Sequence, residues 1–311
     1  MNNDEFAFDQ RYQCLDHGYV NGVEYWGSDE RVIESARMST NKGFNGWGPK
    51  CSECGRNYGN PDSPVPMDKC LCGHAPVNAP GDEKLLRFLW ENKHHTPFEM
   101  AGLTIEVQAP IFVFREWHRH RVPFSYNEAS ARYAPLPDLN YVPTVERLMT
   151  NSDHHHSCAK WKVSTHACDT PRLCADIMSG ANKQAGKVAY AGEYDAVEAE
   201  RTRTNIQIVY NLAQESYEAA LKAGCPKELA RVLLPVGRYS KMRASANLRG
   251  WCNFMQLRQA PNAQYEIRVY ADAVNKILSS IFPRTMRLFN EEVEDKIAAS
   301  DIVSAIKAKK G

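Results

Sequence analysis

The feature that most constrains this 311-residue chain is a polar block, residues 119–133, which directly follows an apolar stretch with helical spacing. Three arginines, one histidine, one glutamate, two serines and one asparagine fall within its fifteen residues. An unpaired charge taken out of water costs several kcal/mol, so this block cannot simply be buried. Arginine forks interleaved with hydroxyls suit phosphate and sugar oxygens; a solvated loop with internal ion pairs is the alternative.

A second polar cluster lies far downstream, among apolar residues. It comprises Arg231, Asn247, Arg249, Asn253 and Arg258. A helix over residues 246–258 would place Arg249 and Asn253 on one face, although an amphipathic surface helix would look the same. Both clusters point to a local anion site.

The overall charge of the chain indicates which kinds of binding partner are disfavoured. The net charge is +1 and the pI is about 7.6, which argues against a long polyanion such as duplex DNA. The N-terminus is acidic and polar, and no run of about 18 apolar residues occurs, so we expect a cytosolic protein without a membrane segment. Its thiols should then be reduced.

Apolar periodicity predicts several elements. Helices are expected over residues 28–40, beginning at Ser28 or Asp29, from an Asp82 cap to about residue 92, from Pro110 onward, over 198–223 ending at Gly224, and from about Ala263 to Ile281. Alternation over residues 103–107 predicts a strand. We expect one domain over residues 1–311, with two irregular insertions at 44–80 and 144–180.

The first insertion contains a cysteine cluster. Cys51, Cys54, Cys70 and Cys72 could hold one structural zinc ion, with His74 as a substitute ligand. The second pair is one residue shorter than the common C-x2-C spacing, and reduced thiols or a redox role are the alternatives. No standard metal spacing occurs in residues 144–180.

Taken together, a series of short blocks resembles the flavin-dependent thymidylate synthases in the order that family has them. The blocks are HHTPFE at 94–99, APIFV at 109–113, RHR at 119–121, SYNEASARY at 125–133, ARVLLP at 230–235, NLR at 247–249, NF at 253–254, LR at 257–258 and AQYEIR at 263–268. Residues 36–39 and 182–184 are similar as well. The resemblance covers about residues 30–290, apart from the two irregular stretches.

The resemblance implies an α/β (α+β) fold with a central mixed β-sheet flanked by helices, assembled as a homotetramer with active sites between chains. It implies reductive methylation of dUMP to dTMP with FAD, NADPH and methylenetetrahydrofolate. FAD would contact Ser39, His94, Thr96, Glu99, His120, Arg121, Asn127, Asn247, Arg249 and Asn253. The nucleotide would contact Arg119, Glu128, Ser130 and Arg132, completed by Arg231 and Arg258 from a different subunit; Arg258 and Ser130 would be catalytic, with Arg258 against the pyrimidine carbonyls.

Several residues depart from the family pattern. Three residues separate Arg121 from Ser125, where the family usually has two, and Met100 and Asn262 replace frequent histidines. Glu116 replaces a common glutamine and would need a cationic partner such as Arg115 or Arg119. These differences leave open a related pyrimidine C5 methylase or hydroxymethylase that acts on dUMP or dCMP.

Other classes fit less well. None of the ten cysteines has the Pro-Cys-His setting of a cysteine-dependent thymidylate synthase, and Cys225 and Cys252 are interpreted as packing residues. A zinc-containing nucleic-acid-binding protein would show a basic face, which the neutral charge argues against. A family member that only binds flavin or nucleotide is a further alternative, which turnover would distinguish.

Overall fold

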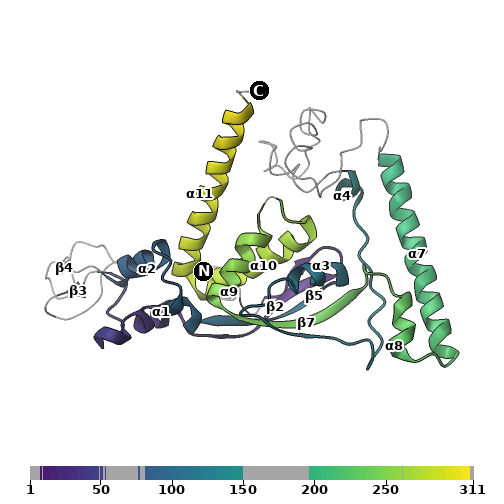
Figure 1. Ribbon diagram of the computed structural model, residues 1–311, viewed down its shortest axis with the longest axis horizontal. Helices are drawn as coiled ribbons and strands as arrows, with labels where there is room; N and C mark the ends of the chain where they lie inside the picture. Colours follow the sequence, from purple (N-terminus) through teal and green to yellow (C-terminus); the bar gives the residue numbers. More distant parts are fainter. Residues whose placement is uncertain are drawn as a thin grey trace.

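The computed structural model describes residues 8, 10–48, 50–51, 53, 76–77, 81–149, 196–260 and 262–308. A five-stranded sheet with strand order β1-β2-β5-β7-β6 forms its centre, and a two-stranded ribbon pairs β3 with β4 (Figure 1). The strands are β1 (Tyr12–Cys14), β2 (Gly18–Trp26), β3 (Lys50–Cys51), β4 (Pro76–Val77), β5 (Gly102–Pro110), β6 (Ser125–Glu128) and β7 (Tyr239–Asn247).

The pairing of the larger sheet corrects one expectation. Every neighbouring pair of its strands is antiparallel, so the predicted mixed sheet was wrong. The apolar periodicity of one strand indicates which of its side chains are buried, but it carries no information on whether the neighbouring strand runs parallel or antiparallel. In β5 the apolar residues Leu103, Ile105 and Val107 are fully buried, as the predicted alternation requires.

Helices cover one face of this sheet. Figure 1 shows α3, α9 and α10 over β2, β5 and β7. The indole ring of Trp117 stacks on Phe254 at 4.8 Å between centroids, and Trp251 Nε1 donates to the Leu103 carbonyl at 2.9 Å. The helices are α1 (Asp29–Ala36), η1 (Met38–Thr40), α2 (Asp82–Glu91), η2 (Thr96–Met100), α3 (Ile111–Trp117), α4 (Val145–Met149), α7 (Ala196–Lys222), α8 (Lys227–Ala230), η3 (Arg231–Leu233), α9 (Leu248–Arg258), α10 (Tyr265–Ile281) and α11 (Pro283–Ala308).

Most helix ends agree with the sequence. The Ser28 side chain caps α1, and Gly224, with φ of +87°, follows the end of α7. The predicted Asp82 cap was wrong, because Gly81 is the N-cap of α2. The fully buried Asp82 carboxylate instead accepts the backbone N–H groups of Asn45 and Gly46, which fix the preceding loop.

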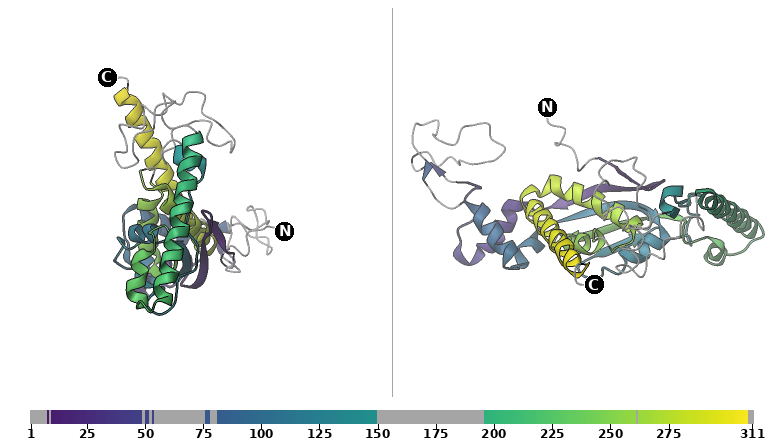
Figure 2. Two further views of the ribbon diagram at one scale, coloured as in Figure 1. Left: turned by 90° about the vertical axis from the view of Figure 1, so that its right-hand side faces the viewer. Right: turned by 90° about the horizontal axis from the view of Figure 1, so that it is seen from above.

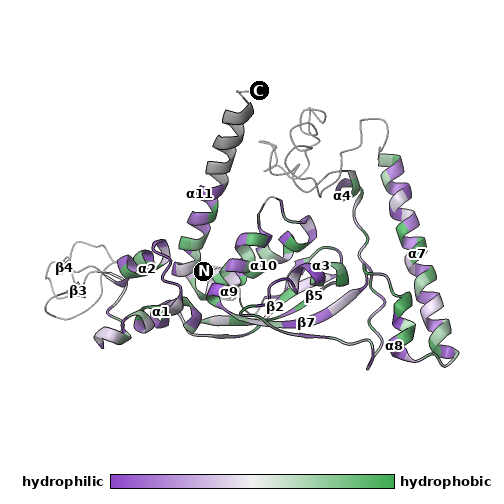
Figure 3. Ribbon diagram, in the orientation of Figure 1, coloured by the Kyte–Doolittle hydropathy of each residue, from purple (hydrophilic) through white to green (hydrophobic). Residues whose placement is uncertain are grey.

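Two long helices extend beyond the layer that covers the sheet. Figure 2 shows that α7 and α11 rise toward the same side of the sheet and stand well apart. Hydrophobic residues recur along the whole of α7 (Figure 3). Among the described residues, no helix combines the length and the apolar character that crossing a membrane requires.

Candidate active site

The two central strands bring distant polar residues together at one end of the sheet. Gly102, at the start of β5, pairs with Asn247, at the end of β7. As a result, Arg249 Nη1 lies 2.5 Å from Glu99 Oε1, and the Leu248 N–H donates to the Ala101 carbonyl at 2.7 Å. Asn247 Oδ1 accepts the Gly250 N–H at 2.9 Å and caps α9. Three residues from the predicted cofactor set, Glu99, Asn247 and Arg249, therefore form one cluster.

The polar loop after α3 packs against the start of the same helix. A Cβ added at Gly250 would lie 2.5 Å from Pro123 Cδ, so only glycine allows this approach. Phe124 packs edge-on against Trp251 at 4.8 Å, and Ser125 pairs with Ser245 where β6 begins. The longer loop between Arg121 and Ser125 is thus accommodated on α9.

Arg258, at the C-terminal end of α9, is held by two residues from the α3 region. Its Nε donates to His120 Nε2 at 2.8 Å, its Nη1 to Glu116 Oε2 at 2.6 Å, and its Nη2 to the Glu116 carbonyl at 2.8 Å. The expected partners of Glu116, Arg115 or Arg119, were therefore wrong. Both of those side chains are exposed on α3 and the following turn, whereas residue 116 faces α9.

His120 is neutral near pH 7 because its surroundings disfavour the imidazolium. Burial, with a further contribution from the Arg258 charge, lowers the pKa of His120 to about 4. Because Nε2 accepts from Arg258, the proton of the neutral ring belongs on Nδ1. The Tyr126 hydroxyl donates to the His120 carbonyl at 2.6 Å and fixes this turn.

A cavity of about 260 Å³ lies beside the cluster of Glu99, Asn247 and Arg249. Its lining includes Arg249, Asn253, His95, the ion-paired Lys93 and Glu292, and the aromatic rings of Phe98 and Phe289. Burial lowers the pKa of His95, and the charges of Arg249 and Lys93 lower it further, so His95 adds no positive charge near neutrality. Guanidinium and amide groups beside aromatic walls suit part of a planar, anionic cofactor such as FAD, and the Glu292 carboxylate in the lining is paired with Lys93.

Other predicted cofactor residues are available at the surface. The exposed residues of this set are Ser39, His94, Thr96, Arg121, Asn127 and Asn253. Within the described ranges, neither Arg119 nor Arg121 pairs with a carboxylate, which leaves both guanidinium groups for a ligand. No hydrogen bond joins Ser39 or Asn127 to the Glu99 cluster in the part of the chain that the structure describes.

A second arginine cluster lies beside α8. Arg132 Nε is 3.3 Å from Glu228 Oε2, and Arg231 Nε donates to the Glu228 carbonyl at 3.1 Å. An open groove of about 340 Å³ runs past Arg132, Tyr133 and Lys227. Glu228 links Arg132 and Arg231 within this chain. The expected division, with Arg132 in one subunit and both Arg231 and Arg258 in another, concerns an assembly of several chains and stays a prediction.

The remaining predicted substrate residues, Glu128 and Ser130, lie between Arg121 and Arg132 in the sequence. The hydroxyl of Ser130 accepts the Arg132 N–H at 3.3 Å, and Glu128 Oε2 lies 3.9 Å from His118 Nε2. Sequence reasoning missed Lys227 and Glu228 at the second cluster. Their position two and three residues before the ARVLLP block at 230–235 was the signal that could have found them.

The zinc prediction falls mainly outside the described residues. Cys51 is buried in β3, whereas Cys54, Cys70 and Cys72 lie outside the described ranges. Among the residues that are described, no group of three or more His, Cys, Asp or Glu side chains could hold a metal ion.

Residues 23–284 match the sequence profile of a family described as thymidylate synthase complementing protein. The chain belongs to this family. It is similar to the flavin-dependent thymidylate synthase of Gluconobacter oxydans (strain 621H), with 29% identity over 286 residues that cover 90% of this chain and 72% of the relative. The flavin-dependent thymidylate synthase of Thermosipho melanesiensis is 28% identical over 284 residues, which cover 89% and 93%.

A solved structure supports the same fold. The crystal structure of a UMP/dUMP methylase, PolB from Streptomyces cacaoi bound with 5-Br dUMP, superposes with a TM-score of 0.61 and 24% identity over 90% of this chain and 97% of that chain. Every predicted substrate and cofactor residue lies inside the part of the chain matched to the thymidylate synthase complementing family. Helix α11 continues beyond it.

Proposed function

We propose that this protein is a flavin-dependent thymidylate synthase, which converts dUMP to dTMP with methylenetetrahydrofolate as carbon donor, NADPH as reductant and FAD as cofactor. The observation that supports this most directly is the meeting of η2 with the start of α9, where Glu99 and Arg249 form an ion pair beside the cavity. At the C-terminal end of the same helix, His120 from the loop at 119–124 contacts Arg258.

The residues of this chain would bind and orient two phosphorylated molecules. Arg249, Thr96, Asn253 and Arg121 would hold FAD, which supplies reducing equivalents when it is bound. The guanidinium of Arg258 would stabilise the negative charge that develops on the pyrimidine carbonyls when C5 becomes nucleophilic. Because His120 is neutral, it would orient the Arg258 guanidinium without itself attracting the negative charge on the pyrimidine carbonyls.

Binding the nucleotide phosphate requires side chains whose positive charge is not fully neutralised by a neighbouring carboxylate. Exposed Arg119 meets this requirement, and Arg132 and Arg231 form a second pair of guanidinium groups that share Glu228. Charge-assisted bonds to phosphate are roughly twice as strong as neutral ones. Ser130 would add a hydroxyl beside Arg132.

One observation favours a second candidate, C5 methylation or hydroxymethylation of dCMP instead of dUMP. Glu116 presents a carboxylate beside Arg258, and a carboxylate only accepts hydrogen bonds. The exocyclic amino group of cytosine could donate to it.

We also propose a homotetramer in the cytoplasm, with active sites between chains. Figure 1 shows α8 beside α7, past the N-terminal end of β7, and α9 over the sheet, so the elements that carry or adjoin Arg231 and Arg258 lie apart in one chain. Exposed apolar side chains on α7, namely Ile208, Val209 and Leu212, would be covered by a second chain. Structural zinc at Cys51, Cys54, Cys70 and Cys72 stays a prediction.

Turnover tests this proposal. The purified protein is mixed with NADPH, methylenetetrahydrofolate and either dUMP or dCMP, and the nucleotide product is identified by mass. We expect dUMP to gain one methyl group. If dCMP is consumed and dUMP is unchanged, the proposed substrate is wrong. If the nucleotide gains a hydroxymethyl group, the proposed product is wrong. Flavin binding without turnover of either nucleotide would contradict the proposed activity.

A further inference from the structure

The turn that leads from α2 into the segment at 94–99 contains a non-glycine residue in the left-handed region. Lys93 has φ of +57°. Its N–H donates to the Trp90 carbonyl at 3.1 Å, and the His94 N–H donates to the Leu89 carbonyl at 2.9 Å, which closes the helix end. Glycine is the usual residue here, because a Cβ is disfavoured at positive φ. A lysine at this position needs compensating contacts.

The side chain of Lys93 provides those contacts. Its Nζ lies 2.9 Å and 3.0 Å from the two carboxylate oxygens of Glu292 on α11, and it sits 5.7 Å from the Trp90 ring centroid. Glu292 lies beyond residue 284, where the match to the family ends. The anchor therefore comes from the part of α11 that lies outside the family match.

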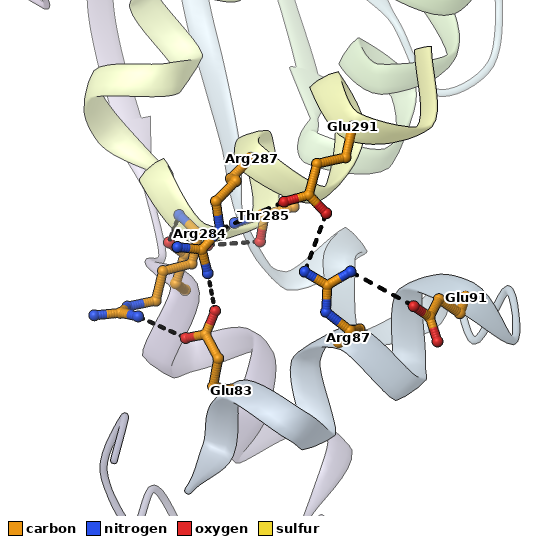
Figure 4. Close-up of polar contacts among 8 residues, drawn as sticks. Glu83, Arg87, Glu91, Arg284, Thr285, Arg287 and Glu291 are labelled. Carbon is orange, nitrogen blue, oxygen red and sulfur yellow. Dashed lines mark hydrogen bonds and ion pairs between the residues drawn. The ribbon is translucent and has the colours of Figure 1, made fainter. Parts of the chain in front are cut away.

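Helix α11 is itself firmly attached to the helices below it. Figure 4 shows Glu83 between Arg284 and Arg287, and Arg87 facing Glu291. Arg87 Nη2 lies 3.0 Å from Glu291 Oε2. The buried Asp29 carboxylate also accepts the Arg284 N–H at 2.8 Å and the Thr285 hydroxyl at 2.6 Å. Glu292 is thus presented to Lys93 from a fixed position.

The two ends of the segment at 94–99 are held differently. Its far end is fixed by buried Phe98 and by the Glu99–Arg249 ion pair. Its near end depends on the turn at Lys93. We propose that Lys93 is a positioning residue: its ion pair with Glu292 holds the left-handed turn and so places His94, Thr96 and Glu99 for FAD. This inference rests on the proposed function.

Two substitutions of Lys93 separate the effect of losing the ion pair with Glu292 from the effect of a Cβ at positive φ. Lys93→Gly removes the anchor but suits positive φ, so its melting temperature should stay close to that of the unmodified protein. Lys93→Ala removes the anchor and keeps a Cβ, so its melting temperature should fall. Lys93→Ala and Glu292→Gln should weaken FAD binding by about five- to tenfold and speed amide hydrogen exchange at residues 94–99, whereas Lys93→Gly, which favours the turn without the anchor, should be less affected than Lys93→Ala in both measurements.

Arg87→Gln is the matched control, because it removes another ion pair between α2 and α11 without touching the turn. It should leave FAD affinity and exchange at 94–99 unchanged. The proposal is overturned if Lys93→Ala and Glu292→Gln bind FAD within about twofold of the unmodified protein, or if only melting temperatures change. Should the unmodified protein bind no FAD, the proposed function fails, whereas exchange at 94–99 in these variants still decides the role of Lys93.

Discussion

The guanidinium of Arg258 is held on one side by a neutral ring nitrogen and on the other by a carboxylate and a backbone carbonyl. Three of its five N–H groups are used by His120 and Glu116, which leaves two for a ligand. Such a group is already oriented before a substrate arrives, and a preoriented charge needs little reorganisation during the reaction.

Substitution of Arg258 tests its catalytic role. Arg258→Ala should lower turnover of dUMP by roughly 10²–10³-fold, because the charge on the pyrimidine carbonyls loses its partner. FAD content, measured by flavin absorbance per chain after gel filtration, should be retained. Arg243→Ala is the control, since Arg243 is an exposed arginine on β7. A near-normal rate in Arg258→Ala would remove Arg258 from the chemistry.

The pH dependence of stability tests the environment of His120. Its pKa is about 4 in the fold and 6.5 ordinarily, so the unfolded chain binds more protons between these values. The contribution of His120 to stability is therefore complete above pH 6.5 and lost as the pH falls toward 4. The unfolding free energy of the unmodified protein minus that of His120→Gln, measured with urea, should decrease over this window. An increase on acidification would mean that the folded protein holds His120 protonated.

At the scale of single residues, the sequence yielded candidate side chains but not which of them are in contact. The proximity of Glu99 and Arg249 requires the pairing of Gly102 with Asn247, which joins residues far apart in the chain. The Glu116–Arg258 pair was missed for a similar reason: neighbours in sequence were considered first. Local reasoning has no access to such partners until the strand register is known.

Elements with strong apolar periodicity were predicted, and those without it were not. The stripe of α10 and the alternation of β5 were both recognised. In β7 the buried positions include Ala244 and Ala246, whose small side chains give little contrast with exposed Lys241 and Arg243. The early strand β2 contains two glycines and was also missed.

At Gly18, the first residue of β2, there is no room for even a single methyl group. A Cβ at Gly18 would collide with the Tyr270 hydroxyl and lie 2.6 Å from the Cys14 carbonyl oxygen. That hydroxyl donates to the Gln108 carbonyl in the core at 3.0 Å, so it cannot move freely. Gly18→Ala should destabilise the protein by about 2–3 kcal/mol in urea unfolding. A loss below about 0.5 kcal/mol would show that α10 shifts easily.

On the scale of the whole molecule, the main prediction is the homotetramer, which the structure of a single chain does not test. Leu212 is 62% exposed on α7, in a row with Ile208 and Val209. Leu212→Glu should convert the tetramer to smaller species in light scattering and abolish turnover, because a charge buried at an interface costs several kcal/mol. Gln207→Glu adds the same charge on another face of α7 and should leave the mass unchanged. A tetramer that survives Leu212→Glu would place the contact elsewhere.

The nine paired residues of β5 and β7 also limit how sequences of this kind can diverge in length. One residue inserted within either strand would displace the following residues by about 3.3 Å and turn their side chains to the opposite face. Glu99 and Arg249 would then no longer meet. The two irregular stretches of this sequence, 44–80 and 144–180, both lie outside these strands. Insertions and deletions among relatives should therefore be confined to the intervals between strands.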